Sequence, residues 1–315
     1  MIYQLGVRLS LARSTPLKLL FAVAAVALLP PVVWAADVAI LKSSDVGAWR
    51  PAIDALQRSA STHRFTEHDV SGDRARGEAV LGALKGKAAV LVALGPLAAA
   101  AAHEVLPDVP MVFCMVQDPA RSGINVGRPT VTGVSFSIPV RNQLATFHLV
   151  DPRSVRIGVI YSEATTAGLV QEAEKAAALL QIVLVTKMVA AEKDVPGALR
   201  ALLKGKEAVD AVWLIPEPLL LGDESRRHIL SETLSAGKPI FSFASSIVQE
   251  GALVSSGPDY ASIGERAGEL VNRLVSGERR IEMVVPRPEI VVNTKIAAKL
   301  KIPLSPAVLK AARTF

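Results

Sequence analysis

The chain has one cysteine, Cys114, among 315 residues, so no disulfide can form within it. Aromatic residues make up only 4% of the composition. The spacings Gly-x-Ser-x-Gly and Gly-x4-Gly-Lys-Ser/Thr are both absent, which removes the usual sequence marks of a serine hydrolase and of a phosphate-binding loop. The five histidines lack the short spacings of helix-borne metal sites. We therefore expect a protein that is not an enzyme and has no catalytic residue, metal or other cofactor.

Strong charge of one sign is also missing. The formal net charge is +6, and Arg8, Arg13 and Lys18 at the N-terminus supply half of it. The remaining basic residues are scattered along the chain rather than clustered, which excludes a nucleic-acid partner.

The first 35 residues have the composition of an export signal. Their three basic residues precede an apolar run at 19–29, and Val33-Trp34-Ala35 offers the small residues that signal peptidase reads. The run is shorter than the roughly 20 residues that span a bilayer, and Pro30-Pro31 ends it. We expect cleavage near Ala35 and a soluble protein in the periplasm.

The rest of the chain alternates short apolar runs with Ala-rich amphipathic stretches, a pattern typical of parallel sheets covered by helices. Strands are predicted at 38–41, 64–70, 89–94 and 109–116, and helices at 46–59, 74–84 and 97–105. The pattern then repeats, with strands at 155–161, 182–189, 209–215 and 239–243 and helices at 166–180, 195–203 and 223–236, and a further helix is predicted at 263–274. This repetition predicts an α/β fold of two Rossmann-like lobes.

Three extended stretches, at 125–138, 254–260 and 281–292, look like crossovers between these lobes. They predict a lobe 1 of residues 36–138 and 258–285, and a lobe 2 of residues 139–257 and 286–315. About 280 residues are enough to bury two such cores without disulfides.

In open parallel sheets, ligands bind beyond the carboxyl ends of the strands, near the first N–H groups of the helices that follow. In lobe 1 this rule selects three short segments. Ser43 and Ser44 follow the first strand and either face a ligand or only cap a helix. Gly95, Pro96 and Leu97 follow the third strand and form either an anion site or an ordinary tight turn. Gln117 and Asp118 follow the fourth, where Asp118 either takes an amine or fixes a turn.

In lobe 2 the same rule selects Tyr161, Thr165 and Thr166 after the first strand. We expect the two hydroxyls to hold the anionic end of a ligand, with a plain capping loop as the alternative. Glu217, placed between two prolines, is a candidate for an ammonium group. The candidates are completed by Ser245, which follows Phe241 and Phe243, and by Asp259 in the second crossover.

Several short segments, taken in order, resemble the ABC-transporter substrate-binding proteins of the type I periplasmic binding protein fold, in the branch of tryptophan and tyrosine binders. The segments are Gly95-Pro96, Val109-Pro110-Met111-Val112-Phe113, Asp118-Pro119, Val131-Thr132-Gly133-Val134-Ser135, Arg156-Ile157-Gly158-Val159-Ile160-Tyr161 with Glu163, Val209-Asp210-Ala211-Val212, Gly251-Ala252-Leu253, Pro258-Asp259-Tyr260 with Ile263-Gly264, Gly277-Glu278, and Val292-Asn293 with Ala297 and Leu300-Lys301-Ile302.

The resemblance implies a monomeric clamshell whose three crossovers act as hinges. It also implies a small polar or zwitterionic ligand between the lobes, and delivery to an inner-membrane ABC permease with its ATPase. The chain departs from the family pattern at cleft positions, where Pro96 stands for a threonine and Glu217 for an aspartate. The resemblance therefore leaves the ligand open.

Three other classes of protein are alternatives. A sensor module for a membrane receptor would share the clamshell and the signal peptide. A secreted hydrolase would need a nucleophile and a base in the cleft. A sugar-responsive repressor would need a helix-turn-helix at the N-terminus, where this chain has an export signal.

Overall fold

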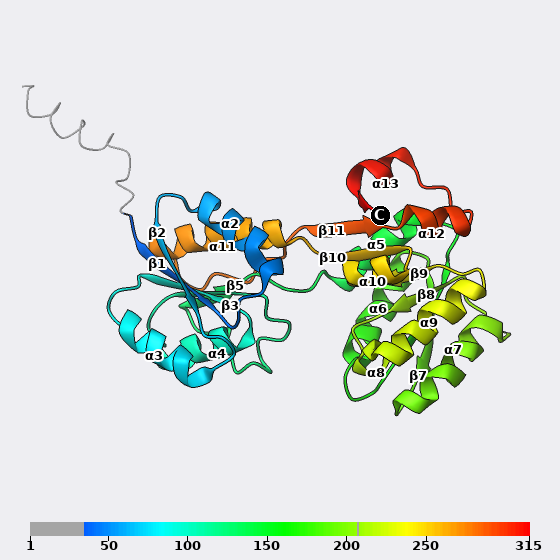
Figure 1. Cartoon of the computed structure of the whole chain (residues 1–315), viewed down its shortest axis with the longest axis horizontal. Helices are drawn as coiled ribbons and strands as arrows, with labels where there is room; N and C mark the ends of the chain where they lie inside the picture. The colour runs from blue at the N-terminus through cyan, green and yellow to red at the C-terminus, as the bar shows by residue number, and fades with distance from the viewer. Residues whose placement is uncertain (1–34, 207) are drawn as a thin grey trace, which may run out of the picture. The chain divides into compact units, whose positions relative to one another are not determined.

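The computed structural model describes residues 35–206 and 208–315. The predicted export signal falls on residues 1–35, and all but its last residue lie outside the described part of the chain. The described chain contains two sheets, each in a lobe of its own (Figure 1).

The sheet of lobe 1 has five parallel strands in the order β2-β1-β3-β4-β5. They span Asp37–Lys42 (β1), Arg64–Asp69 (β2), Val90–Leu94 (β3), Met111–Cys114 (β4) and Val131–Gly133 (β5). Every residue of β3 and β4 is buried, as expected for strands covered on both faces. β4 is shorter than the predicted strand because Met115 adopts a left-handed φ of 57°.

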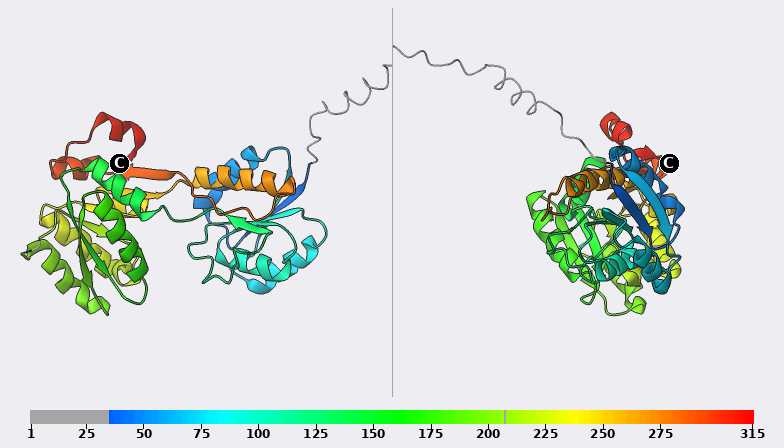
Figure 2. Two further views of the ribbon diagram at one scale, coloured as in Figure 1. Left: turned by 180° about the vertical axis from the view of Figure 1, so that it is seen from behind. Right: turned by 90° about the vertical axis from the view of Figure 1, so that its left-hand side faces the viewer.

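Helices cover both faces of this sheet, as the two views in Figure 2 show. The short helix η1 (Gly47–Trp49) leads into α2 (Arg50–Ser59), which packs on one face with α11 (Tyr260–Val275). The other face carries α3 (Arg74–Leu84) and α4 (Pro96–Val105). The alternation of strand residues between the two faces divides the core of lobe 1 into two apolar clusters.

The sheet of lobe 2 has seven strands in the order β12-β11-β10-β9-β8-β6-β7. They span Arg156–Tyr161 (β6), Val183–Met188 (β7), Ala211–Leu214 (β8), Ile240–Ser242 (β9), Val254–Pro258 (β10), Pro288–Val292 (β11) and Arg313–Thr314 (β12). The order β7-β6-β8-β9-β10 repeats that of lobe 1, and β10 and β11 form the one antiparallel pair among the described strands. The predicted fold of two Rossmann-like lobes is confirmed.

Nine described helices accompany this sheet. In chain order they are α5 (Val140–Val150), α6 (Ala167–Leu179), η2 (Glu192–Asp194), α7 (Val195–Lys204), α8 (Pro218–Leu221), α9 (Asp223–Ser235), α10 (Ser245–Glu250), α12 (Thr294–Lys299) and α13 (Pro306–Ala311). α5 packs beside α6, and α7 and α8 pack against α9. In the core, Phe147 of α5 stacks on Phe241 of β9 at a centroid distance of 4.9 Å.

Three chain segments cross between the lobes: the one between β5 and α5, the one from β10 to α11, and the one that leads to β11 (Figure 1). They are tied to one another by backbone hydrogen bonds. Ser135 N donates to Val284 O, and Asp259 N donates to Arg287 O. The sequence predicted all three crossovers, but not that two of them continue as strands β10 and β11 of the second sheet.

No helix in the described ranges is both long and apolar enough to cross a membrane.

Candidate functional site

Glu217 organises the carboxyl end of the lobe 2 sheet. β6 and β8 are neighbours there, and their following loops carry Ser162 to Thr166 and Glu217. The Glu217 side chain caps α8 through Leu219 N, and its Oε2 receives hydroxyl contacts from Ser162 at 2.8 Å, Thr165 at 2.5 Å and Thr166 at 2.6 Å. Ser162 N donates to the same oxygen at 3.1 Å.

Glu217 is fully buried, with 0% of its surface exposed. Burial acts to raise the pKa of Glu217, but the hydrogen bonds from Thr165, Thr166, Ser162 and Leu219 N outweigh it and hold the pKa below its usual value. The group is therefore an internal carboxylate whose acceptor oxygens are occupied by its own lobe. It does not contact the solvent from which the predicted ammonium ligand would approach.

The corresponding place in lobe 1 is at the carboxyl ends of the neighbouring strands β1 and β3. Ser43, at 8% exposure, accepts a hydrogen bond from Ala98 N at 2.9 Å, so it caps the start of α4. Gly95 has a φ of 87°, and a Cβ there would lie 2.6 Å from Ser43 Oγ. Both the backbone conformation and the contact therefore require glycine. Ser43 thus occupies the Ala98 N–H next to the predicted anion site at Gly95 to Leu97, and within that site Gly95 N donates to Cys114 O at 2.9 Å and Pro96 has no N–H.

A large hollow is lined by residues of both lobes and of the three crossovers. Seven predicted site residues line it, namely Pro96, Gln117, Asp118, Thr165, Thr166, Ser245 and Asp259. Six others do not: Ser43, Ser44, Gly95, Leu97, Tyr161 and Glu217. Among the first set, Asp259 caps α11 through Ala261 N and Ser262 N, and Asp118 accepts from Arg121 N in its own turn.

Aromatic side chains of the crossovers also line the hollow, and the sequence analysis did not select them as site residues. Phe136 and Tyr260 stack with centroids 6.0 Å apart and an interplanar angle of 27°. Burial and the nearby Glu289 carboxylate raise the pKa of Tyr260, so its hydroxyl stays protonated. Phe243 of the same lining directly follows β9. Aromatic residues are scarce in this chain, yet two of them, Phe136 and Tyr260, lie in predicted crossovers. This placement could have marked them as site residues.

Two buried serines on β10 were also missed. Ser255 and Ser256 are each 1% exposed, line the hollow, and have no hydrogen-bond partner for their Oγ atoms among the described residues. A buried hydroxyl without a partner costs about 1–3 kcal/mol, so such groups at a hollow are suited to receive a polar ligand.

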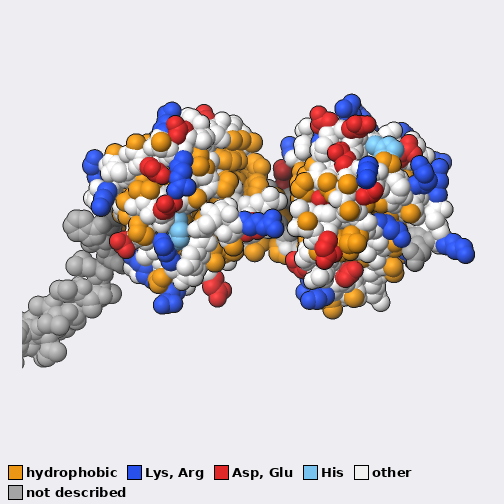
Figure 3. Space-filling view, turned by 90° about the horizontal axis from the view of Figure 1, so that it is seen from below, with side chains coloured by type: hydrophobic (Ala, Val, Ile, Leu, Met, Phe, Trp, Pro, Cys, Tyr) orange, Lys and Arg blue, Asp and Glu red, His pale blue; other side chains and the backbone are white. Residues whose placement is uncertain are grey.

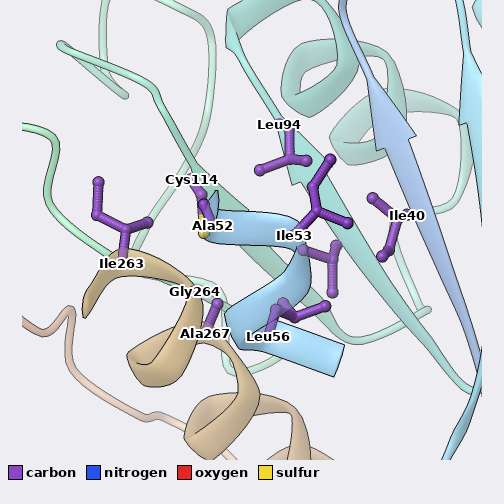
Figure 4. Close-up of a pocket in the computed structure, with 10 residues that line it drawn as sticks. Ile40, Ala52, Ile53, Leu56, Leu94, Cys114, Ile263, Gly264 and Ala267 are labelled. Carbon is purple, nitrogen blue, oxygen red and sulfur yellow. The ribbon is translucent and has the colours of Figure 1, made fainter. Parts of the chain in front are cut away.

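A second, much smaller cavity lies inside lobe 1 between α2, α11 and the sheet (Figure 4). Its volume of about 10 Å³ is no more than one water molecule needs, and its lining is apolar, including Ile40, Ile53 and Cys114. It is a packing gap of the core and offers no group that would bind a ligand.

The described histidines lie outside the hollow. His63 Nδ1 contacts Ala36 N, and His103 Nε2 contacts Asn125 N. No group of His, Cys, Asp or Glu side chains in the described ranges has the arrangement of a metal centre. Acidic and basic side chains are interspersed on the face in Figure 3, without a basic patch of the kind that binds nucleic acid.

Two sheets that share one order over five strands, three crossovers and a hollow at the carboxyl ends of both sheets define the type I periplasmic binding protein fold. A profile of the ABC transporter substrate binding protein family matches residues 60–315. The chain belongs to this family, and the family resemblance seen in the sequence is confirmed.

One relative is the tyrosine-binding protein of Clostridioides difficile strain R20291. It is 27% identical over 196 residues, which cover 60% of this chain and 55% of that protein. The match thus spans little more than half the length of this curated relative.

Two solved structures share the fold. The ligand-free, open structure of a substrate binding protein with adhesive properties from Clostridium difficile has a TM-score of 0.75 at 18% identity, covering 89% of this chain and 99% of that one. An ABC domain from Streptococcus pneumonia in complex with L-Trp has a TM-score of 0.59 at 20% identity, covering 89% and 100%.

Proposed function

We propose that this protein is the solute-binding component of an ABC importer that captures a small zwitterionic, amino-acid-like metabolite in the periplasm. The observation that carries the proposal is the hollow itself, in a member of the substrate-binding family. Stacked rings and buried hydroxyls without a partner in the described part of the chain meet there at the carboxyl ends of two sheets. The relative named for tyrosine and the neighbour holding L-Trp support a ligand of this class.

Each part of the lining has a role in this proposal. Phe136, Tyr260 and Phe243 would contact the apolar part of the ligand, which suits their flat faces. Ser255 and Ser256 would donate to its polar groups. Closure of the lobes would exclude water and strengthen these hydrogen bonds.

The hinges would lie at the three crossovers, near the boundaries 138/139, 257/258 and 285/286. A permease that recognises only the closed form would then select the loaded protein, which after export would act as a monomer and pass its ligand to the permease and ATPase.

Mass spectrometry of small molecules that co-purify with the protein, followed by calorimetry with each candidate, tests the proposal. We expect one-site saturable binding of an amino acid or a close analogue. Absence of saturable binding across all amino acids and their derivatives would contradict it. Turnover of an ester or amide panel would instead favour the hydrolase alternative.

A further inference from the structure

The Glu217 carboxylate sets the direction in which the three hydroxyl groups around it donate their hydrogen bonds; we call this direction their polarity. Each hydroxyl carries one proton, and a carboxylate only accepts hydrogen bonds. Ser162, Thr165 and Thr166 all lie within 2.8 Å of Glu217 Oε2. Ser162 Oγ and Thr165 Oγ1 are also 2.6 Å apart, so one of these two hydroxyls can donate to the other instead. In either arrangement each hydroxyl has an acceptor for its proton inside the cluster, and Ser162 N also lies 3.4 Å from Thr166 Oγ1 as a donor.

The direction of these hydrogen bonds determines which atoms the lobe 2 end of the hollow offers to a ligand. Thr165 and Thr166 line the hollow, whereas Glu217 and Ser162 lie behind them. With their protons directed inward, the two threonines offer only oxygen lone pairs to a ligand. These lone pairs attract a hydrogen-bond donor and repel another acceptor.

Negative charge at this end comes from the protein itself. The Glu217 carboxylate lies 2.6 Å from the side chain of Thr166, the residue that precedes α6. A helix start favours one negative charge, and Glu217 already supplies it. A ligand carboxylate bound to Thr165 or Thr166 would lie within a few ångströms of that charge, in a partly dry site where repulsion is strong.

The charged residues of the lining also favour a cationic group on the ligand. Four are acidic, namely Asp118, Glu172, Asp259 and Glu289, and two are basic. Arg121 lies 3.5 Å from Asp118, and Arg313 lies 3.1 Å from Glu289, so both cations are already paired with carboxylates. The hollow therefore carries an acidic surplus without counting Glu217.

We propose that Thr165 Oγ1 and Thr166 Oγ1 bind the ammonium group of the ligand, and that Glu217 is a positioning residue that turns both hydroxyls into acceptors and supplies the countercharge. The proposal rests on the proposed function and reverses the polarity expected from the sequence, in which these hydroxyls hold the anionic end. A ligand must then carry a positively charged hydrogen-bond donor on the side that faces lobe 2.

Calorimetry with matched sets of probes tests the polarity. One set is L-tyrosine, tyramine and 3-(4-hydroxyphenyl)propionate, and a second is L-tryptophan, tryptamine and indole-3-propionate, with the corresponding set for any amino acid that co-purifies. We expect the amine to bind at least about tenfold more tightly than the acid of its set, the size of one charged hydrogen bond. An acid that binds as tightly as its amine overturns the proposal but leaves the proposed function standing.

Substitutions decide the polarity even where only the intact amino acid binds. Glu217→Gln removes the countercharge at nearly constant shape and should weaken amino-acid binding about tenfold. If the hydroxyls instead held a carboxylate, this change would strengthen binding. Because a buried substitution can impair folding, Thr165→Lys provides an independent arm at an exposed position.

Thr165→Lys places a cation beside the proposed ammonium site and should weaken amino-acid binding by at least about tenfold, through like-charge repulsion. The matched control is Ser231→Lys, which adds the same charge at an exposed position of α9 outside the lining and should change affinity less than about threefold. Unchanged or tighter binding by Thr165→Lys overturns the proposal. Failure of every probe to bind the unmodified protein overturns the proposed function and this polarity with it.

Discussion

Gly264 of α11 lies directly against the carbonyl group of Ala52 in α2. A Cβ built on Gly264 would lie 1.9 Å from Ala52 O, closer than any non-bonded contact allows. α11 thus meets α2 backbone to backbone, although the two helices are more than 200 residues apart in the sequence. This contact attaches the helix that follows the second crossover to the core of lobe 1.

We therefore expect Gly264→Ala to lower the free energy of unfolding by about 3 kcal/mol, because the helices must separate to admit a methyl group. Urea unfolding followed by circular dichroism measures this. Gly82→Ala in α3 is the control, since a Cβ there meets no atom within 4 Å, and it should stabilise the protein by up to about 1 kcal/mol. Equal effects of the two substitutions would contradict the close packing of α11 on α2.

Glu217 should give the stability a specific dependence on pH. Its folded pKa lies below the ordinary value of 4.5, so the carboxylate is stabilised by folding. Its contribution is complete above the ordinary pKa and is lost as the pH falls through the lower folded pKa. Between about pH 5 and pH 3, Glu217→Gln should therefore lose less unfolding free energy than the unmodified protein. Parallel pH profiles would show that Glu217 is not held ionised by its hydroxyl partners.

Cys114 should be unreactive in the folded protein. Burial raises the pKa of its thiol to about 12, so almost none of it is thiolate at mildly alkaline pH. We expect iodoacetamide to leave the native protein unlabelled and to add one label per chain in denaturant, as mass spectrometry would show. Rapid labelling of the native chain would place the thiol at an accessible surface instead.

The Ser256 hydroxyl should lower the stability of the ligand-free protein and strengthen ligand binding. Its buried hydroxyl has no partner among residues 35–206 and 208–315, so Ser256→Ala should stabilise the ligand-free protein by about 1 kcal/mol in thermal unfolding while it weakens ligand binding several-fold. Ser242 on the neighbouring strand β9 is the control, because its single hydroxyl proton has two acceptors within reach, Ala244 O at 3.2 Å and Val254 O at 3.3 Å. Ser242→Ala should destabilise the protein. A loss of stability in Ser256→Ala would mean that this hydroxyl is satisfied within the fold.

Among the parts of the fold that the sequence analysis did not predict, α5 is the largest. Its buried residues Val140, Leu144, Phe147 and Val150 follow the spacing of an amphipathic helix, so a signal was present. The helix begins directly after Pro139, at the end of a stretch rich in turn residues, and that neighbourhood obscured it. The short helices α8, α10, α12 and α13 span only four to six residues, too few for a periodic pattern to show.

The sequence by itself determined the class of this protein. Alternating apolar and amphipathic runs specify strands and covering helices, because burial on two faces requires near-continuous apolar strands. Only the tertiary structure decided the chemistry of the site. Thr166 and Glu217 are 51 residues apart and meet because β6 and β8 are neighbours in the sheet. Whether a hydroxyl offers a proton or a lone pair depends on the partner behind it, and local sequence does not specify that partner.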